Sequence, residues 1–218
     1  DTVDPLLRPI KADDFWLPDQ KTAYIEMARA SGLAHLAEKE RNPLKTSTFG
    51  TGVLIADALK RGAIHIILTV GGSATNDAGI GMAAALGWRF LDAKGAILET
   101  VGANLIQVDS ISAAELSPCT FTVVTDVTNP LAGTSGAAHI FAAQKGASST
   151  VIKQLDKGLN NIAKFFGSIA SEPGAGAAGG LQPRPDAAGP GCGARGLGPE
   201  GSRPGGRLHR LKPARLCH

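Results

Sequence analysis

The stretch AIHIILTVGGSATNDAGIGMAAALG, residues 63–87, indicates the fold more clearly than any other part of the sequence. Its first eight residues form a nearly unbroken run of β-branched and other apolar side chains, which predicts a strand buried on both faces of a parallel sheet. Paired glycines and a cluster of Ser, Thr, Asn and Asp follow, and small helix-forming residues then continue from about Ala78 to Leu86. Because Gly87 ends that pattern, the stretch predicts a strand, a polar turn and a helix.

The flanking sequence repeats this alternation of strand-like and helix-like patterns, which is typical of α/β proteins. Apolar residues with strand character occupy residues 22–28 and 120–127, and Lys94-Gly95 predicts a hairpin turn. The helical spacing of apolar residues predicts helices over residues 46–62 and 149–169. We therefore expect an α/β domain.

The composition changes abruptly after Leu181. Residues 182–218 contain no Val, Ile, Phe, Tyr, Trp or Met, and they carry six Arg and one Lys against one Asp and one Glu. Since such a segment cannot form a packed apolar face, we expect a folded domain over residues 1–181 and a disordered Gly/Pro/Arg-rich tail over residues 182–218. The tail is either a natural basic segment that attracts RNA or membranes, or an out-of-frame reading of a GC-rich gene. The abruptness of the change favours the second explanation.

Composition also argues against several classes of protein. No stretch is long and apolar enough to span a bilayer, and the opening DTVDPLL lacks the basic start and apolar centre of a signal peptide. Three scattered cysteines, Cys119, Cys192 and Cys217, do not match a disulfide framework or a zinc site. The net charge of +3 comes from the tail and leaves the domain mildly acidic, which gives no indication of nucleic-acid binding by the domain. We expect a cytoplasmic protein without a membrane partner.

The polar turn after residues 63–70 is suited to an anion. A strand that runs into paired glycines and then a helix brings backbone N–H groups and the positive end of the helix to one point. Asp77 could hold Mg²⁺ or accept a hydroxyl proton. The alternative is that Thr75, Asn76 or Asp77 simply caps the helix, although a cap needs only one side chain. The candidate donors to a carboxylate or phosphate are Gly71, Gly72, Ser73, Thr75 and Asn76.

A second set of polar residues follows the predicted strand at 120–127. Asp126 stands at the strand end, Asn129 precedes a proline, and Lys145 follows a Gly/Thr/Ser turn. Because ligands of α/β sheets bind beyond the carboxyl ends of the strands, we expect these three residues to meet the glycine turn in one cleft. The alternative is a long surface loop with a turn at Asn129 and a solvated Lys145.

Two further residues have open interpretations. Glu26, in the otherwise apolar YIEMA, is either a group of the active site or a side chain on the polar face of a strand. His65 lies within a predicted strand and belongs to no nucleophile or metal pattern, so we expect it to be structural.

Several blocks together resemble the bacterial glycerate kinase family, whose members phosphorylate D-glycerate with ATP. The blocks are YIEMARASGL, RNPLKTSTFGTGVLI, GGSATNDAGIGMAAALG, DVTNPLAGTSGAA and QKGA, in family order and spacing. The likeness extends over residues 1–181, and PGAGAAGG at 173–180 also resembles the family. The sequence departs from it at Val53, Ala78 and Thr125, where the family usually has an acidic residue, glycine and cysteine.

The resemblance implies a two-domain α/β enzyme. This chain resembles its middle domain, a mixed sheet with helices that is likened to restriction endonucleases, and the flavodoxin-like partner domain is largely missing. The implied reaction is transfer of the γ-phosphoryl group of Mg·ATP to a hydroxyl of glycerate, giving 2-phosphoglycerate if the C2 hydroxyl attacks. Asp77 or Asp126 would be the catalytic acidic group, and Asn129 and Lys145 would contact substrate or phosphate.

The family's lysine-bearing DSFKG motif, its DGGEGT motif and its later TGEGR motif are absent from the chain. The alternatives to an active kinase are therefore a non-catalytic binding module, whose basic tail attracts acidic partners, and an unstable product of a broken gene.

Overall fold

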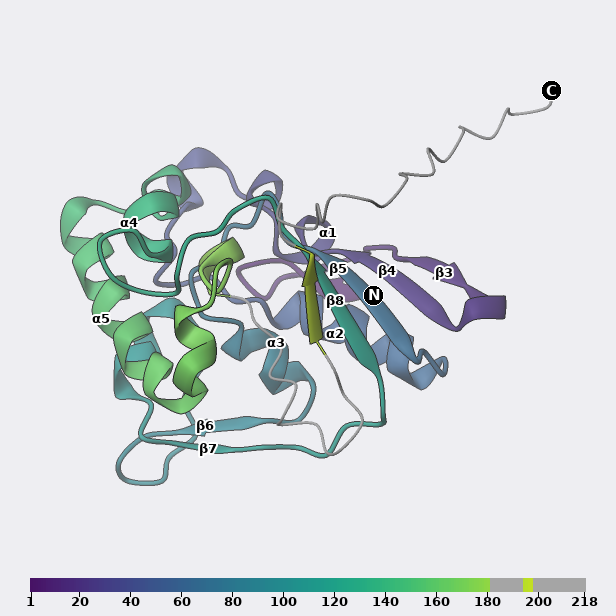
Figure 1. Ribbon diagram of the computed structural model, residues 1–218. Helices are drawn as coiled ribbons and strands as arrows, with labels where there is room; N and C mark the ends of the chain where they lie inside the picture. Colours follow the sequence, from purple (N-terminus) through teal and green to yellow (C-terminus); the bar gives the residue numbers. More distant parts are fainter. Residues whose placement is uncertain (181–193, 198–218) are drawn as a thin grey trace, which may run out of the picture.

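The central element of the computed structural model is a mixed five-stranded sheet in the order β3-β4-β5-β8-β9 (Figure 1). The structure describes residues 1–180 and, as the backbone of one short strand, residues 194–197. Strand β3 runs antiparallel to β4, and the other neighbours are parallel. The predicted α/β class with a mixed sheet is thus confirmed. The strands are β3 Phe15–Leu17, β4 Thr22–Glu26, β5 His65–Thr69, β8 Thr120–Val124 and β9 Ala194–Leu197.

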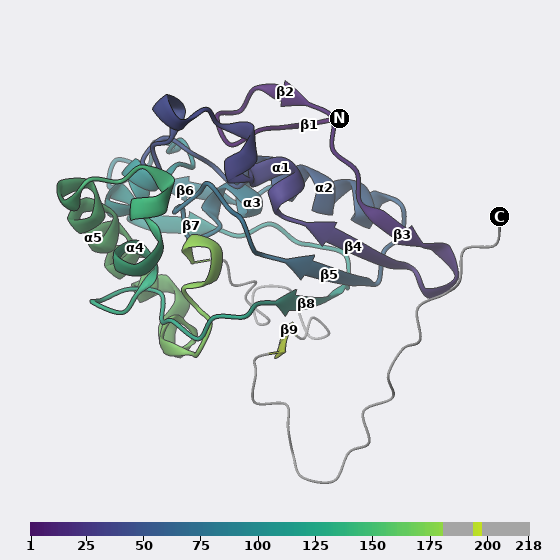
Figure 2. The ribbon, with the colours of Figure 1, turned by 90° about the horizontal axis from the view of Figure 1, so that it is seen from above.

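One face of this sheet forms a hydrophobic core with helix α2, Phe49–Lys60. Alternation along the strands places Ile25, Leu68 and Val123 side by side in the register, and all three are buried. Helix α1, Ala28–Ser31, and α2 lie on the same side of the sheet (Figure 2). Leu54, Ile55 and Ala58 of α2 complete this core.

The opposite face of the sheet is only partly covered. Tyr24 is 39% exposed and Val124 is 40% exposed, and Ile67 between them is half-buried. The expectation that residues 63–70 are buried on both faces is therefore wrong. The reason is that helix α2 packs on the face that carries Ile25, Leu68 and Val123, and not on the face that carries Tyr24 and Val124.

A second hydrophobic cluster lies beside the sheet and centres on helix α5, Ser149–Phe166. Leu155, Leu159 and Ile162 of α5 are fully buried there against η4, Gly102–Gln107, and α4, Ala137–Phe141. The remaining elements are α3 Ile80–Ala85, the pair β6 Arg89–Leu91 and β7 Ser110–Ser112, the pair β1 Thr2–Val3 and β2 Pro9–Ile10, and short 3₁₀ turns. Those turns are η1 Pro18–Gln20, η2 Leu33–His35, η3 Glu38–Glu40, η5 Ala143–Lys145, η6 Gly167–Ser171 and η7 Ala177–Gly179.

The predicted helices and central strands are all present, and their ends differ by a few residues. Helix α3 begins at Ile80, two residues after Ala78, because Ala78 and Gly79 both have positive φ. Helix α5 ends at Phe166 because Gly167 takes φ +60°. The turn at Lys94-Gly95 forms, but β6 pairs mainly with the distant β7 and only through one bridge with the segment after the turn.

The predicted tail, residues 182–218, lies outside the described residues except for β9. In the part of the chain that the structure describes, no helix is long and apolar enough to cross a membrane.

Candidate active site

The turn after β5 is held rigidly by the segment that follows α1. The backbone N–H of Leu33 donates to the Gly72 carbonyl at 2.9 Å, and the N–H of Ala74 donates to the Ser31 carbonyl at 2.9 Å. Gly72 has φ +70°, a conformation that glycine adopts without a steric penalty. Backbone hydrogen bonds on both sides of Gly72 therefore define the shape of the turn.

Lys145 reaches this turn from the other end of the sequence. It belongs to η5, and its side chain is only 2% exposed. Its Nζ donates to Ser73 Oγ at 2.8 Å and to the Thr75 carbonyl at 2.6 Å. Burial lowers the pKa of Lys145 to about 7, and the nearby carboxylate of Asp77 opposes that change. The alternative of a solvated Lys145 is thus wrong, because the lysine is enclosed where the two polar loops meet.

The two loops line one pocket of about 210 Å³, as expected from their positions at the ends of parallel strands. Gly71, Gly72 and Ser73 come from the turn after β5, whereas Asp126 comes from the turn after β8. Asp126 is exposed to solvent, and Lys145 lies in the wall. The other lining residues are Val70, Thr125, Val127, Phe141, Gln144 and Ala178.

Asp77 lies behind the pocket and connects two helices. Its Oδ2 accepts hydrogen bonds from the backbone N–H and the hydroxyl of Thr48, both at 2.8 Å, and from the N–H of Gly81 at 3.3 Å. Its Oδ1 accepts from the N–H of Gly79 at 3.3 Å, and Thr48 Oγ1 in turn accepts from the N–H of Met82. Burial raises the pKa of Asp77, and these hydrogen bonds partly oppose the change. This geometry matches the capping alternative, extended to the starts of both α2 and α3.

Thr75 and Asn76 bring buried polar atoms without partners to the same region. Both residues are fully buried, and Thr75 Oγ1 and both polar atoms of the Asn76 amide make no hydrogen bond within the described residues. The Nε of Arg41 is also buried and has no partner within the described residues, and the Arg41 backbone lies against Gly146, next to Lys145. Neither Thr75 nor Asn76 is among the residues that line the 210 Å³ pocket, although both were predicted as donors to its ligand. Because buried polar groups are almost always hydrogen-bonded, their unpartnered atoms are candidates for contact with a bound polar molecule.

Asn129 is not among the residues that line the pocket. Its amide donates to the Ser135 carbonyl at 2.9 Å, and its own carbonyl accepts from the N–H of Gly176 at 2.8 Å. These contacts correspond to the alternative in which Asn129 shapes a loop.

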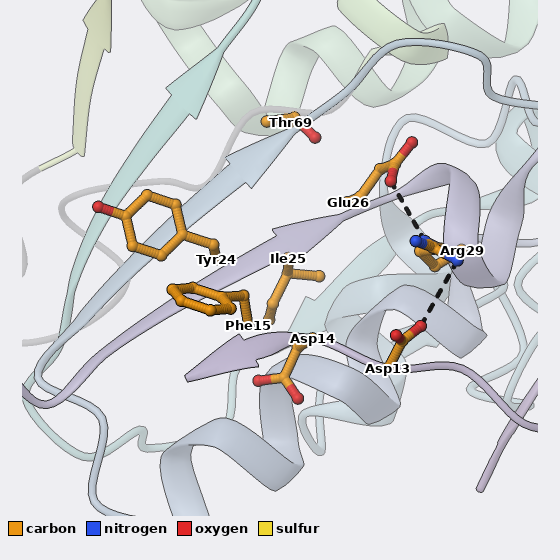
Figure 3. A pocket seen from close by; sticks show the side chains of 8 residues that line it. All are labelled: Asp13, Asp14, Phe15, Tyr24, Ile25, Glu26, Arg29 and Thr69. Carbon is orange, nitrogen blue, oxygen red and sulfur yellow. Dashed lines mark hydrogen bonds and ion pairs between the residues drawn. The ribbon is translucent and has the colours of Figure 1, made fainter. Parts of the chain in front are cut away.

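Glu26 and His65 also have defined surroundings. Glu26 is exposed and its carboxylate pairs with Arg29 at 3.3 Å, in a separate cavity of about 450 Å³ that Asp13, Phe15 and Tyr24 also line (Figure 3). The sequence left its role open, and the structure places it on the more exposed face of the sheet. His65 Nε2 lies 2.9 Å from Thr122 Oγ1 across two neighbouring strands, as expected for a structural residue.

Sequence reasoning missed two contributors to the site. Thr48 was not singled out, although a Thr directly before the first residues of α2 is a recognisable capping position. The turn PGAGAAGG was noted only for its family likeness, yet Ala178 lines the pocket and its carbonyl accepts from Ser73 Oγ at 3.2 Å. Gly179 lies so close to the Thr75 carbonyl that a Cβ there would approach it to 2.4 Å. The dense glycines of that turn were the available signal.

The chain is similar to several known proteins. The sequence model of the glycerate kinase family matches residues 1–183. A glycerate kinase from Bacillus cereus is 46% identical over 186 residues, which cover 81% of this chain and 49% of that protein. A glycerate 2-kinase from Escherichia coli K12 is 46% identical over 172 residues, covering 75% and 45% of the two chains.

A crystal structure of a provisionally assigned glycerate kinase 2 from Salmonella typhimurium LT2 superimposes with a TM-score of 0.81 at 40% identity. The match covers 89% of this chain and 54% of that one. The chain thus spans about half the length of the curated relatives that it matches. Because the family model covers most of its length, this chain belongs to the glycerate kinase family.

Proposed function

We propose that this chain carries the phosphoryl-transfer site of a glycerate kinase, which moves the γ-phosphoryl group of ATP to a hydroxyl of D-glycerate and gives 2-phosphoglycerate. One observation carries the proposal: the turns after two parallel strands meet at a single pocket that contains a buried lysine. The name of the Escherichia coli relative, a glycerate 2-kinase, supports the choice of acceptor and of the C2 hydroxyl.

The residues of the pocket suit phosphoryl transfer. That reaction depends mainly on holding two reactants in line and on neutralising the charge on the transferred group. Gly71 and Gly72 have no side chains, so their backbone can approach an anion closely, and Ser73 adds a hydroxyl. Lys145 adds an amine at the back of the same surface. We assign phosphate binding to these four residues.

Thr75 and Asn76 are the candidates for the acceptor. Their unpartnered polar atoms could bind the hydroxyls and carboxylate of glycerate, because an amide both donates and accepts hydrogen bonds. Thr75 also contacts Lys145 through its carbonyl, which puts this pair directly beside the phosphate-binding residues. We assign Asn129 to shaping the loop and Asp77 to positioning the two helices.

Asp126 is the residue that fits Mg²⁺. Magnesium is usually held by one or two carboxylates together with oxygens of the substrate phosphates, and it neutralises their charge when bound. Asp126 offers a solvent-exposed carboxylate on the pocket, whereas both oxygens of Asp77 already accept hydrogen bonds. Within the described residues no cluster of three metal-ligating side chains occurs.

We also propose that residues 1–181 correspond to the middle domain of a two-domain enzyme, with the flavodoxin-like domain outside this chain. This proposal is supported by the length of the match, because the chain aligns with only about half of each relative. Residues outside this chain would then complete the nucleotide site. Activity of the chain alone is accordingly a separate question from ligand binding by its pocket.

The test measures binding and turnover separately on the 218-residue chain. Calorimetry would detect binding of D-glycerate and of Mg·ATP, and ³¹P NMR would follow conversion to 2- or 3-phosphoglycerate. Asp126→Asn should weaken Mg·ATP binding, and where the chain turns over it should reduce turnover by about 10²–10³-fold, in line with the loss of a charge-stabilising group. Asp109→Asn, on another exposed acidic residue, is the matched control. A folded chain that binds neither ligand would refute the proposal.

A further inference from the structure

Lys145 is a buried cation-forming group without an anionic hydrogen-bond partner. Its Nζ contacts a hydroxyl and a carbonyl, both neutral, and no carboxylate forms an ion pair with it within the described residues. A buried ammonium without a counter-ion is strongly disfavoured, so the structure favours the neutral amine when no ligand is bound. Burial accordingly lowers the pKa of Lys145 to about 7.

The hydrogen bonds of Lys145 leave one position on the nitrogen for a ligand. The Thr75 carbonyl can only accept, and Ser73 Oγ can donate to the Ala178 carbonyl, so two N–H groups of Lys145 point to protein acceptors. The nitrogen bears either a lone pair or a third N–H at its remaining position. The residue lines the 210 Å³ pocket, which is large enough for a phosphoryl group.

Three charged residues belong to the surroundings of Lys145. Asp77 acts on it through space, and Asp126 lines the same pocket. The backbone and Cβ of Arg41 lie against Gly146, next to Lys145. The four hydrogen bonds of the Asp77 carboxylate come from Thr48, Gly79 and Gly81, and none of them comes from Lys145.

We propose that the Ser73–Lys145 pair forms a proton-linked binding site for a phosphoryl dianion, in which the amine takes one proton from solvent as the dianion enters and releases it as the dianion leaves. The step is balanced: a neutral amine, a proton and the dianion become an ammonium–dianion pair, and no covalent bond to phosphorus changes. The identity of the dianion as a phosphoryl group of nucleotide or product rests on the proposed function.

The coupling between proton uptake by Lys145 and binding of the dianion has a defined size and sign. An opposite charge within about 4–6 Å raises the pKa of a lysine by about 1–3, which offsets much of the effect of burial. At pH 8 the free amine is about nine-tenths neutral, so binding should take up about 0.4 proton if the pKa rises by one and about 0.9 proton if it rises by three. Between pH 7 and the raised pKa, the affinity for a dianion that does not itself titrate should fall by up to about tenfold for each pH unit.

Sulfate is the probe, because it remains a dianion between pH 6 and 9 and any proton taken up therefore comes to the protein. The 218-residue chain would be labelled with ¹³C at lysine Cε, and the pKa of Lys145 would be read by NMR with and without sulfate. Calorimetry at pH 8, in two buffers of different ionisation enthalpy, would count the protons. We expect the pKa of Lys145 to rise by about 1–3 and the uptake at pH 8 to lie between about 0.4 and 0.9 proton.

Two variants test whether sulfate binding and proton uptake depend on Lys145. Lys145→Met should weaken sulfate binding at least tenfold and abolish the proton uptake, whereas Lys153→Met, on the exposed side of α5, should change neither. If Lys145→Met does not fold, the NMR titration of the unaltered chain decides alone. The inference is overturned if Lys145 titrates near 10 without ligand, if sulfate binds without proton uptake, or if sulfate does not bind at pH 6.5. Proton-linked sulfate binding by a chain that binds neither D-glycerate nor Mg·ATP would refute the proposed function and leave this site standing.

Discussion

The replacement of Asp77 by Asn tests whether this residue organises the site or takes part in chemistry. Asp77 Oδ2 accepts two hydrogen bonds at 2.8 Å from Thr48 and one at 3.3 Å from Gly81, and Oδ1 accepts from Gly79. In Asp77→Asn one oxygen can stay in place for Thr48 and Gly81. The new NH₂ group then faces the N–H of Gly79, so two donors oppose each other.

The expected destabilisation follows from these contacts. Each of the two short bonds from Thr48 changes from a charged to a neutral acceptor, which weakens it by about 1 kcal/mol, and the unpaired N–H of Gly79 adds about 1–3 kcal/mol. Relief from burying a charge offsets part of the sum. We expect a net loss of about 2–4 kcal/mol in the free energy of unfolding, or about 6–12 °C in Tm.

Urea unfolding followed by circular dichroism would measure this loss as a shift of the midpoint at unchanged slope. Asp57→Asn is the control, because Asp57 is 65% exposed and pairs with Arg61 on the surface of α2, a contact worth less than about 1 kcal/mol. Equal stability of the two variants would refute the architectural role. If Asp77→Asn also lost turnover at unchanged stability, the catalytic alternative would replace it.

Three other substitutions test neighbouring features. Ala78 has φ +52°, so Ala78→Val should cost more than about 2 kcal/mol by thermal unfolding while Ala78→Gly stays within about 1 kcal/mol of the parent; equal effects would contradict the strain argument. Gly81→Ala should cost about 2–3 kcal/mol in urea, because its Cβ would come within 2.2 Å of Ser47 Oγ and 2.7 Å of the Phe49 nitrogen; a neutral result would disprove that close packing. Lys145→Met should remove a pH dependence of stability. Between pH 7 and 10 the unfolded chain binds a proton on Lys145 that the folded chain lacks, so the free energy of unfolding of the parent, relative to this variant, should rise by up to about 1.4 kcal/mol per pH unit. Parallel urea titrations would measure it, and a difference in unfolding free energy that does not change with pH would show that Lys145 is charged when buried.

The rigidity of the glycine turn has a consequence for the family. Its backbone is hydrogen-bonded to residues 31–33, its helix is anchored by Thr48, and the PGAGAAGG turn packs over Thr75. The blocks of the family pattern are thus the segments that contact one another around this turn. Their joint presence reflects one packed structure, since a change in any block would move the backbone that lines the pocket.

Local patterns in the sequence were sufficient for the secondary structure and for the family. The apolar run at 63–70, the helical spacing at 149–169 and the glycines at helix ends depend on residues close together in the chain, so β5, α5 and their ends were predictable to within a few residues. The position of Asp126 and of the glycine turn after parallel strands was also enough to predict that they share a pocket.

The roles of individual side chains depended on the tertiary structure. Lys145 has the sequence context of a surface lysine, and only packing over a distance of 72 residues buries its amine against Ser73. Asp77 has the sequence context of a metal ligand or base, but the fold brings Thr48, 29 residues earlier, to its carboxylate with two hydrogen bonds at 2.8 Å, beside the longer ones from Gly79 and Gly81. The physical reason is that burial and hydrogen-bond partners set the charge and availability of a side chain, and in this fold both are supplied by segments distant in sequence.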